Sequence, residues 1–123
     1  MSDTDLNRVP DGGTLRVLAS GLEIVRRKKH EWSNHLTRLT PEELKRKTNK
    51  VWGSKFLAFW TLEALVDRIE REVTTARWSD SAQEPSPLDI VDVHEIGLAS
   101  GESVHTIRIV CDGRYIHAYP IED

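Results

Sequence analysis

One cysteine and five histidines are the side chains of this sequence that could act in nucleophilic catalysis or bind a metal ion. Cys111 is the single cysteine, and the histidines are His30, His35, His94, His105 and His117. A cysteine becomes an activated nucleophile when an imidazole lies within hydrogen-bond distance of its sulfur. The predicted strands place Cys111 on the core face and His117 on the opposite face, and they place His105 about 20 Å along the strand. We therefore expect no catalytic thiol and interpret Cys111 as a small buried residue.

The histidines do not form a metal-binding pattern. None belongs to an HExxH motif, and no close pair has a cysteine or carboxylate at a recognised ligand spacing. We therefore expect solvated histidines, no metal and no other cofactor. The sequence also lacks a glycine-rich phosphate loop and a Ser-His-Asp order, which favours a non-enzymatic function.

Polar and aromatic side chains share one face of a hairpin predicted near the C-terminus. Asp112-Gly113 separates IRIVC from RYIHAY and predicts a two-residue turn, with Cys111 opposite Arg114. The outer face then carries Arg108, Tyr115, His117 and Tyr119, while Ile107, Ile109, Cys111, Ile116 and Ala118 face the core. His94 joins the outer set if residues 100–102 form a three-residue loop, and a four-residue loop would turn it to the core. These residues are candidates for a ligand-binding or hydrolytic site.

Charge is segregated along the chain. The net charge of −3 is the sum of −2 over residues 1–25, +7 over residues 26–55 and −8 over residues 56–123. Basic side chains near aromatic ones suit nucleic acid, because phosphates supply affinity and exposed bases stack. Candidate nucleic-acid-binding residues are Arg26, Arg27, Lys28, Lys29, Lys45, Arg46 and Lys50. Against this function, the whole chain is acidic and carries no recognised nucleic-acid-binding motif. The two charged segments would also attract each other within one chain or between protein partners.

The N-terminal half is predicted to form a helical hairpin. Residues 1–13 are polar and end in Pro-Asp-Gly-Gly, which indicates a flexible leader closed by a turn. Over residues 14–39, apolar side chains recur on one half of a helical wheel, as in an amphipathic helix. The alternative for residues 14–27 is a β-hairpin with Ser20-Gly21 as its turn. The continuation of the apolar stripe as far as Leu39 favours the helix.

A second predicted helix covers residues 41–77. Thr40-Pro41-Glu42-Glu43 is a capping box with proline at the first helical position. At the centre of this helix Phe56, Leu57 and Trp60 point away from the main apolar stripe, so the helix needs cover on both sides. Large apolar side chains of this kind form the centres of protein interfaces. They are candidates for contact with a second copy or another protein, with burial in the core of the chain as the alternative.

Three strands follow a polar linker at residues 78–87. Alternation and turn residues place the strands at residues 88–98, 103–111 and 114–121. The expected fold is therefore a two-layer α+β domain over residues 14–123, in which the helical hairpin packs on a three-stranded antiparallel meander. The length of 123 residues fits one such domain.

Composition limits the remaining possibilities. No apolar run approaches the roughly 18–20 residues of a membrane span, the N-terminus does not resemble a secretory signal, and a single cysteine fits the reducing cytoplasm. We therefore expect a small binding or assembly module that makes no membrane contact. It would self-associate or bind a protein through the helix at 41–77. Nucleic-acid association through the basic tip of the helical hairpin is the first alternative, and the outer sheet face is the second.

Overall fold

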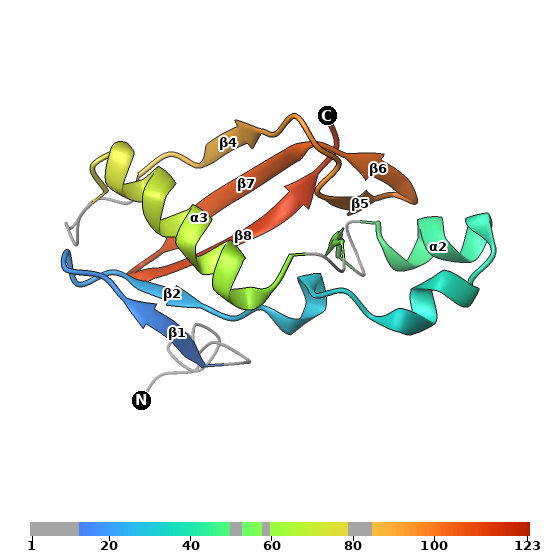
Figure 1. Ribbon diagram of the computed structural model, residues 1–123, viewed down its shortest axis with the longest axis horizontal. Helices are drawn as coiled ribbons and strands as arrows, with labels where there is room; N and C mark the ends of the chain where they lie inside the picture. The colour runs from blue at the N-terminus through green and yellow to red at the C-terminus, as the bar shows by residue number, and fades with distance from the viewer. Residues whose placement is uncertain (1–12, 50–52, 58–59, 79–84) are drawn as a thin grey trace.

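A computed structural model describes residues 13–49, 53–57, 60–78 and 85–123 of the chain (Figure 1). Within these residues eight strands form two sheets, and the helices are short. The predicted helical hairpin on a three-stranded meander is therefore wrong, although the fold combines helices and sheets. None of the described helices is long and apolar enough to cross a bilayer. Most of the predicted leader and linker lies outside the described residues.

The larger sheet has the strand order β1-β2-β8-β7-β4. Its strands are β1 (Thr14–Val17), β2 (Glu23–Val25), β8 (Tyr115–Ile121), β7 (Thr106–Asp112) and β4 (Leu88–Val91). Neighbouring strands are antiparallel except β2 and β8, which are parallel. The helix α3 (Leu62–Thr75) lies across one face of this sheet (Figure 1).

The first predicted helix is replaced by strands and short turns of 3-10 helix. β1 and β2 form an antiparallel hairpin, so the alternative for residues 14–27 is confirmed. Gly21 has a φ of +94°, which glycine adopts without the steric cost other residues pay. The chain continues through η1 (Lys28–His30) and η2 (Asn34–Arg38). A few closely spaced apolar residues satisfy both the helical and the extended pattern, which explains the wrong prediction.

The second predicted helix is two helices separated by a strand. α2 (Pro41–Lys47) begins with the predicted capping box, in which Thr40 Oγ1 accepts from the Glu43 N–H and the Glu43 carboxylate accepts from the Thr40 N–H. It ends at Thr48, and Gly53 has a φ of +93°, which a helix does not permit. The chain then forms β3 (Lys55–Phe56) before Thr61 caps α3. The apolar residues of 41–77 follow the helical period on both sides of this strand, and that continuity does not reflect a single helix.

The predicted faces of the C-terminal hairpin are confirmed, but its register is not. Cys111 pairs with Ile116, and the turn residues are Gly113 and Arg114, with a φ of +67° at Gly113. This register differs from the predicted one by two residues, so every side chain keeps its face. The predicted core-facing residues of both strands are all buried, and they pack with Val66, Ile69 and Val73 of α3.

The strands predicted at 88–98 and 103–111 are each divided between the two sheets. β5 (Gly97–Ala99) and β6 (Glu102–Val104) join β3 in a small sheet of order β3-β5-β6. Ser100 and Gly101 form the turn between them, both with positive φ. Neither predicted loop length at this turn is correct.

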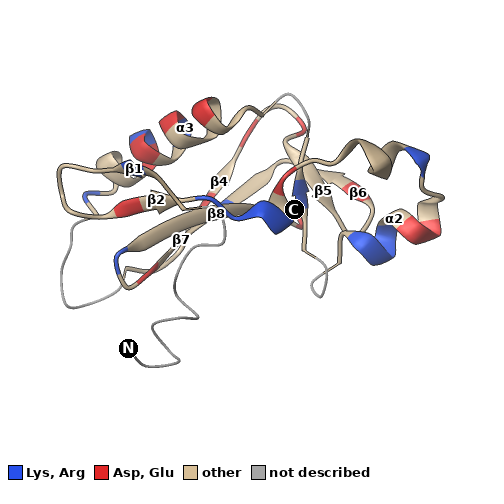
Figure 2. Ribbon diagram, turned by 90° about the horizontal axis from the view of Figure 1, so that it is seen from below, with Lys and Arg blue, Asp and Glu red and all other residues tan. Residues whose placement is uncertain are grey.

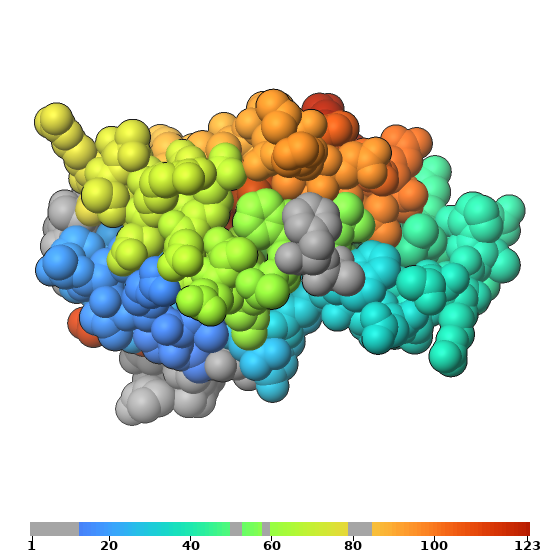
Figure 3. Space-filling model, in the orientation of Figure 1, coloured from blue at the N-terminus to red at the C-terminus, as the bar shows by residue number. Residues whose placement is uncertain are grey.

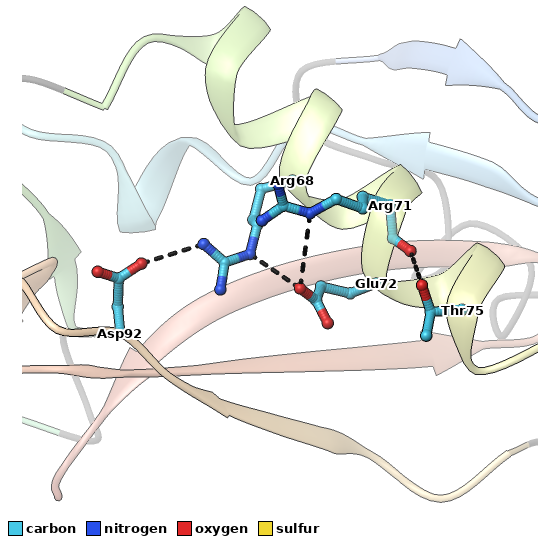
Figure 4. A network of polar contacts seen from close by, with 5 residues as sticks. All are labelled: Arg68, Arg71, Glu72, Thr75 and Asp92. Atoms are coloured by element: carbon cyan, nitrogen blue, oxygen red, sulfur yellow. Dashed lines mark hydrogen bonds and ion pairs between the residues drawn. The ribbon is translucent and has the colours of Figure 1, made fainter.

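One half-buried ion network fastens α3 to the chain beyond β4. Arg68 Nε donates to Glu72 Oε1, one helical turn away, and its Nη1 donates to Asp92 Oδ2, both at 3.0 Å (Figure 4). In the space-filling view α3 covers one part of the molecule, while η2 and α2 form the opposite end (Figure 3). Arg108, His117 and Tyr119 lie on the face of β7 and β8 that points away from α3.

Candidate functional site

A cavity of about 570 Å³ lies against the face of β7 and β8 that points away from α3. Arg108, His117 and Tyr119 line it, and they alternate along these strands with residues that face the core. The other walls come from η1, residues 53–54, the end of α2 and the β5–β6 turn. Its volume lies within the range of about 300–1,000 Å³ that is typical of small-molecule sites.

Three aromatic rings form a row beside the cavity. His117 and Tyr119 are two residues apart on β8, so their side chains share a face, and their ring centroids are 5.9 Å apart. His30 from η1 stacks on Tyr119, with centroids 5.1 Å apart and ring planes at 17°. The row therefore joins the sheet to a segment that is distant in sequence.

His30 is buried, and one hydrogen bond fixes its tautomer. Its Nδ1 lies 2.7 Å from the carbonyl oxygen of Ser54, which can only accept, so Nδ1 carries the proton. The Ser54 hydroxyl in turn donates to the carbonyl of Pro120 on β8. The pKa of His30 is lowered to about 4, chiefly by burial and in smaller part by the charges of Lys29 and Lys55, while the bond to Ser54 opposes the change. His30 is therefore neutral at pH 7, with its lone pair on Nε2.

Arg108 is held as a permanent cation at the cavity wall. Its Nε and Nη2 donate to the two carboxylate oxygens of Asp89, its partner on β4, at 2.8 and 2.9 Å. The Asp89 carboxylate and the Tyr119 hydroxyl raise the pKa of Arg108 above its already high ordinary value. This two-point contact orients the guanidinium plane.

The end of α2 is locked against the β5–β6 turn at the edge of the cavity. The Ser100 N–H donates to the Thr48 carbonyl at 3.0 Å, and the Gly101 N–H donates to Thr48 Oγ1 at 2.7 Å. A Cβ at Gly101 would lie 2.9 Å from the Cα of Lys45. This packing places the basic last turn of α2 next to the cavity.

Cations without a carboxylate partner are concentrated in and beside η1, η2 and α2. On the side of α3, Arg16 pairs with Asp67 and Glu70, and Arg68 pairs with Glu72 and Asp92. No carboxylate of the described residues lies within ion-pair distance of Arg27, Lys29, Arg38, Lys45 or Arg46. Figure 2 shows the basic segment around η1 and the basic end of α2 as separate groups. Lys29 lines the cavity, and Lys55 donates a hydrogen bond to the Lys29 carbonyl.

The cavity brings together three of the five residues predicted for the outer sheet face: Arg108, His117 and Tyr119. Tyr115 lies near the turn of the hairpin, where it pairs with Glu23 of β2, and it does not line the cavity. His94 lies in the exposed chain after β4, and its N–H donates to the Asp92 carboxylate. Because Arg108 has Asp89 as its cross-strand partner, the predicted neighbourhood of His94 and Arg108 is wrong.

The predicted interface residues do not lie on one exposed helix face. Phe56 is in β3 with 4% of its surface exposed, and its ring centroid lies 6.2 Å from that of Trp60. Leu57 and Trp60 are half-buried. Phe56 therefore belongs to the core of the chain.

The predicted nucleic-acid-binding residues fall at two places. Arg26, Arg27, Lys28 and Lys29 lie in or just before η1, where Arg26 pairs with Glu31, and Lys45 and Arg46 lie in the last turn of α2. Lys50 lies outside the described residues. The tip of a helical hairpin, as predicted, does not exist. Of these residues Lys29 lines the cavity, and the α2 turn that carries Lys45 and Arg46 ends at Thr48, which also lines it.

The sequence did not single out His30, Thr48 or Ser54 as site residues. His30 was expected on the surface, and Thr48 and Ser54 have no motif that marks them. Gly53-Ser54 was the available signal, because a glycine at this point interrupts a helical pattern. In the described part of the chain no group of histidine, cysteine, aspartate and glutamate residues is arranged to hold a metal ion.

Comparison with known proteins places the chain in no family: no family model, no curated protein and no solved structure matches it.

Proposed function

We propose that the protein binds a small phosphate-bearing ligand in the cavity between η1, the end of α2 and the outer face of β7 and β8. The observation that carries this proposal is a cavity lined by Lys29, by an oriented arginine and by aromatic rings, next to the chain segments that carry the other cations without carboxylate partners. Arg108 is itself paired with Asp89, so the charge without a carboxylate partner at the cavity wall is that of Lys29.

The chemistry of the lining suits a phosphate ester better than a carboxylic acid or a neutral molecule. Arginine and lysine both bind phosphate, and a guanidinium whose plane is already fixed loses little entropy on binding. Tyr119 adds a hydroxyl that can donate to a phosphate oxygen, and the neutral His30 adds no negative charge. Among the described residues of the lining Glu122 is the single anion, and it is at the exposed C-terminal edge.

The test is a titration of the 15N-labelled protein with inorganic phosphate, adenosine and adenosine monophosphate. We expect adenosine monophosphate to shift the amide signals of the cavity segments, with adenosine alone producing much smaller shifts. Arg108→Gln should weaken binding about tenfold or more, because a charge-assisted hydrogen bond is lost. Arg114→Gln is the matched control, since it removes the same charge at the far end of the same hairpin.

Two results would overturn the proposal. One is the absence of any shift with adenosine monophosphate at millimolar concentration. The other is an equal loss of affinity in the two arginine variants, because this would indicate attraction to net charge without a site. Arg108→Lys retains the charge and keeps the test usable if Arg108→Gln does not fold.

Protein binding is a second candidate, and the edge strand β4 favours it. Among the described strands β4 pairs with β7 alone, and Val91 and Val93 nearby expose 74% and 88% of their surface. An open edge with apolar side chains is a typical place for a second copy or a peptide to add a strand. Val91→Lys should abolish any dimer that sedimentation detects, while a dimer that persists would exclude this edge. A cytoplasmic location belongs to this proposal as an expectation from the single, buried cysteine.

A further inference from the structure

We infer that the ligand of the cavity is one nucleotide of a single-stranded nucleic acid, whose neighbouring phosphates contact the basic groups at η1 and at the end of α2. This inference rests on the proposed function, because it needs the cavity to accept a phosphate ester. It adds that the ligand belongs to a nucleic-acid strand, and that this strand leaves the cavity toward the two basic groups.

The basic groups lie at two separate edges of the cavity. Lys29 belongs to η1 and lines the cavity. Lys45 and Arg46 are exposed in the last turn of α2 and do not line the cavity. The contacts of Thr48, which does line it, with Ser100 and Gly101 hold that turn beside a second edge. A free nucleotide carries its phosphate at one position and can reach one edge only, whereas a polynucleotide presents phosphates on both sides of each base.

The alternation of rings and cations favours nucleic acid over an acidic peptide. A single strand alternates charged phosphates with flat bases, and proteins bind it with cations along the backbone and rings near the bases. The row of His30, Tyr119 and His117 begins in η1, beside Lys29, and continues along β8 at the cavity wall. An acidic peptide offers carboxylates but has no flat group for the concave, ring-lined centre.

The concave shape favours a single strand over a duplex. A base can enter a cavity only when it has left its stack, and extrusion from a duplex costs a few kcal/mol. Single strands offer such bases at low cost. The small number of cations at the two edges also limits the site to a few phosphates.

The test measures fluorescence anisotropy of labelled RNA and DNA single strands of about ten nucleotides, a length typical of one small domain. The competitors are the matching duplex, adenosine monophosphate and a poly-glutamate peptide. We expect the single strands to bind more tightly than the duplex and the mononucleotide, with a slope of log affinity against log salt of about −2 for three phosphate contacts. RNA and DNA strands differ in the 2′-hydroxyl, and comparing them identifies which one the site prefers.

A double variant, Lys45→Glu with Arg46→Glu, separates this inference from the proposed function. It should weaken oligonucleotide binding about tenfold or more and reduce the salt slope by about 1.4, while the affinity for adenosine monophosphate stays within about twofold. Arg71→Glu with Arg77→Glu is the matched control, because it makes the same charge change at exposed positions of the α3 segment. Amide shifts of the unmodified protein with the oligonucleotide provide a second readout at residues 45–49, whether or not a variant folds.

Several results of these binding experiments would overturn the inference, and they differ in what they imply for the proposed function. Binding of adenosine monophosphate without tighter binding of the oligonucleotide would overturn this inference and leave the proposed function intact. Equal effects of the two double variants, or displacement by poly-glutamate at matched charge, would identify general attraction to polyanions and overturn it. Preference for the duplex would overturn it as well. Failure of both the nucleotide and the oligonucleotide to bind would overturn the inference together with the proposed function.

Discussion

Replacement of His30 should remove much of the acid sensitivity of the fold. The pKa of His30 is about 4 in the folded protein against an ordinary value of 6.5, chiefly because the ring is buried with 6% of its surface exposed. The unfolded chain therefore binds a proton at a higher pH than the folded chain does. Stability from the neutral ring is fully present above pH 6.5 and is lost progressively as the pH falls toward 4.

The magnitude follows from the two pKa values. The full difference corresponds to about 3 kcal/mol, and about 2 kcal/mol of it is expressed between about pH 7.5 and pH 5. His30→Asn retains an N–H that can donate to the Ser54 carbonyl but does not titrate. The variant should be less stable at pH 7.5, because it loses the stacking on Tyr119, yet its free energy of unfolding should fall much less on acidification.

Urea unfolding followed by tryptophan fluorescence at several pH values measures both curves. His94→Asn is the matched control, since it makes the same substitution at an exposed histidine outside the cavity. A constant difference in unfolding free energy between the natural protein and His30→Asn from pH 7.5 to 5 would refute the reasoning. Titration of the His30 ring protons by NMR in the unmodified protein gives an independent check, and an apparent pKa near 6.5 would refute it too.

Two further substitutions test the local structure around the site. Thr40→Ala removes the oxygen that accepts from the Glu43 N–H and should lower the unfolding free energy by about 1 kcal/mol; an unchanged urea midpoint would show that the cap contributes nothing. Gly97→Ala would place a Cβ 2.5 Å from Pro120 Cγ and 2.6 Å from the Lys55 carbonyl, so it should cost about 2 kcal/mol or more. Circular dichroism and urea unfolding measure this loss, and wild-type stability of the variant would contradict the close packing of β5 against β3 and β8.

The parts of the fold that local signals determine could be predicted from the sequence. The capping box at Thr40 and the alternating faces of β7 and β8 depend on residues close together in the chain, and both are confirmed. The hairpin register was wrong by two residues because glycine also suits the first turn position when an ordinary residue follows it. Asp112-Gly113 therefore permitted two turns, and the sequence alone does not choose between them.

The parts that depend on contacts between distant segments could not be predicted. Strand β2 lies parallel to β8, and its short apolar run carries no sign of a partner about ninety residues away. The cavity has the same origin, because η1, Gly53-Ser54, Thr48 and β8 meet only after the chain has folded. Candidate residues on one element, such as Arg108 and Tyr119, could be found, whereas His30 could not.

The segregated charge of the chain is the feature that connects the fold to its proposed ligand. Attraction within the chain would be expected to join the basic segment 26–55 to the acidic segment 56–123. Among the ion pairs between described residues none does so: Arg26 pairs with Glu31 inside the basic segment, and Arg68 and Arg108 pair inside the acidic one. The ion pairs of the described residues therefore do not use this attraction, and burial keeps His30 neutral beside Lys29 and Lys55. Like charges held together without internal partners repel one another, and a bound polyanion would remove that repulsion. We therefore propose that Lys29, Lys45 and Arg46, which have no carboxylate partner among the described residues, stabilise a complex with nucleic acid.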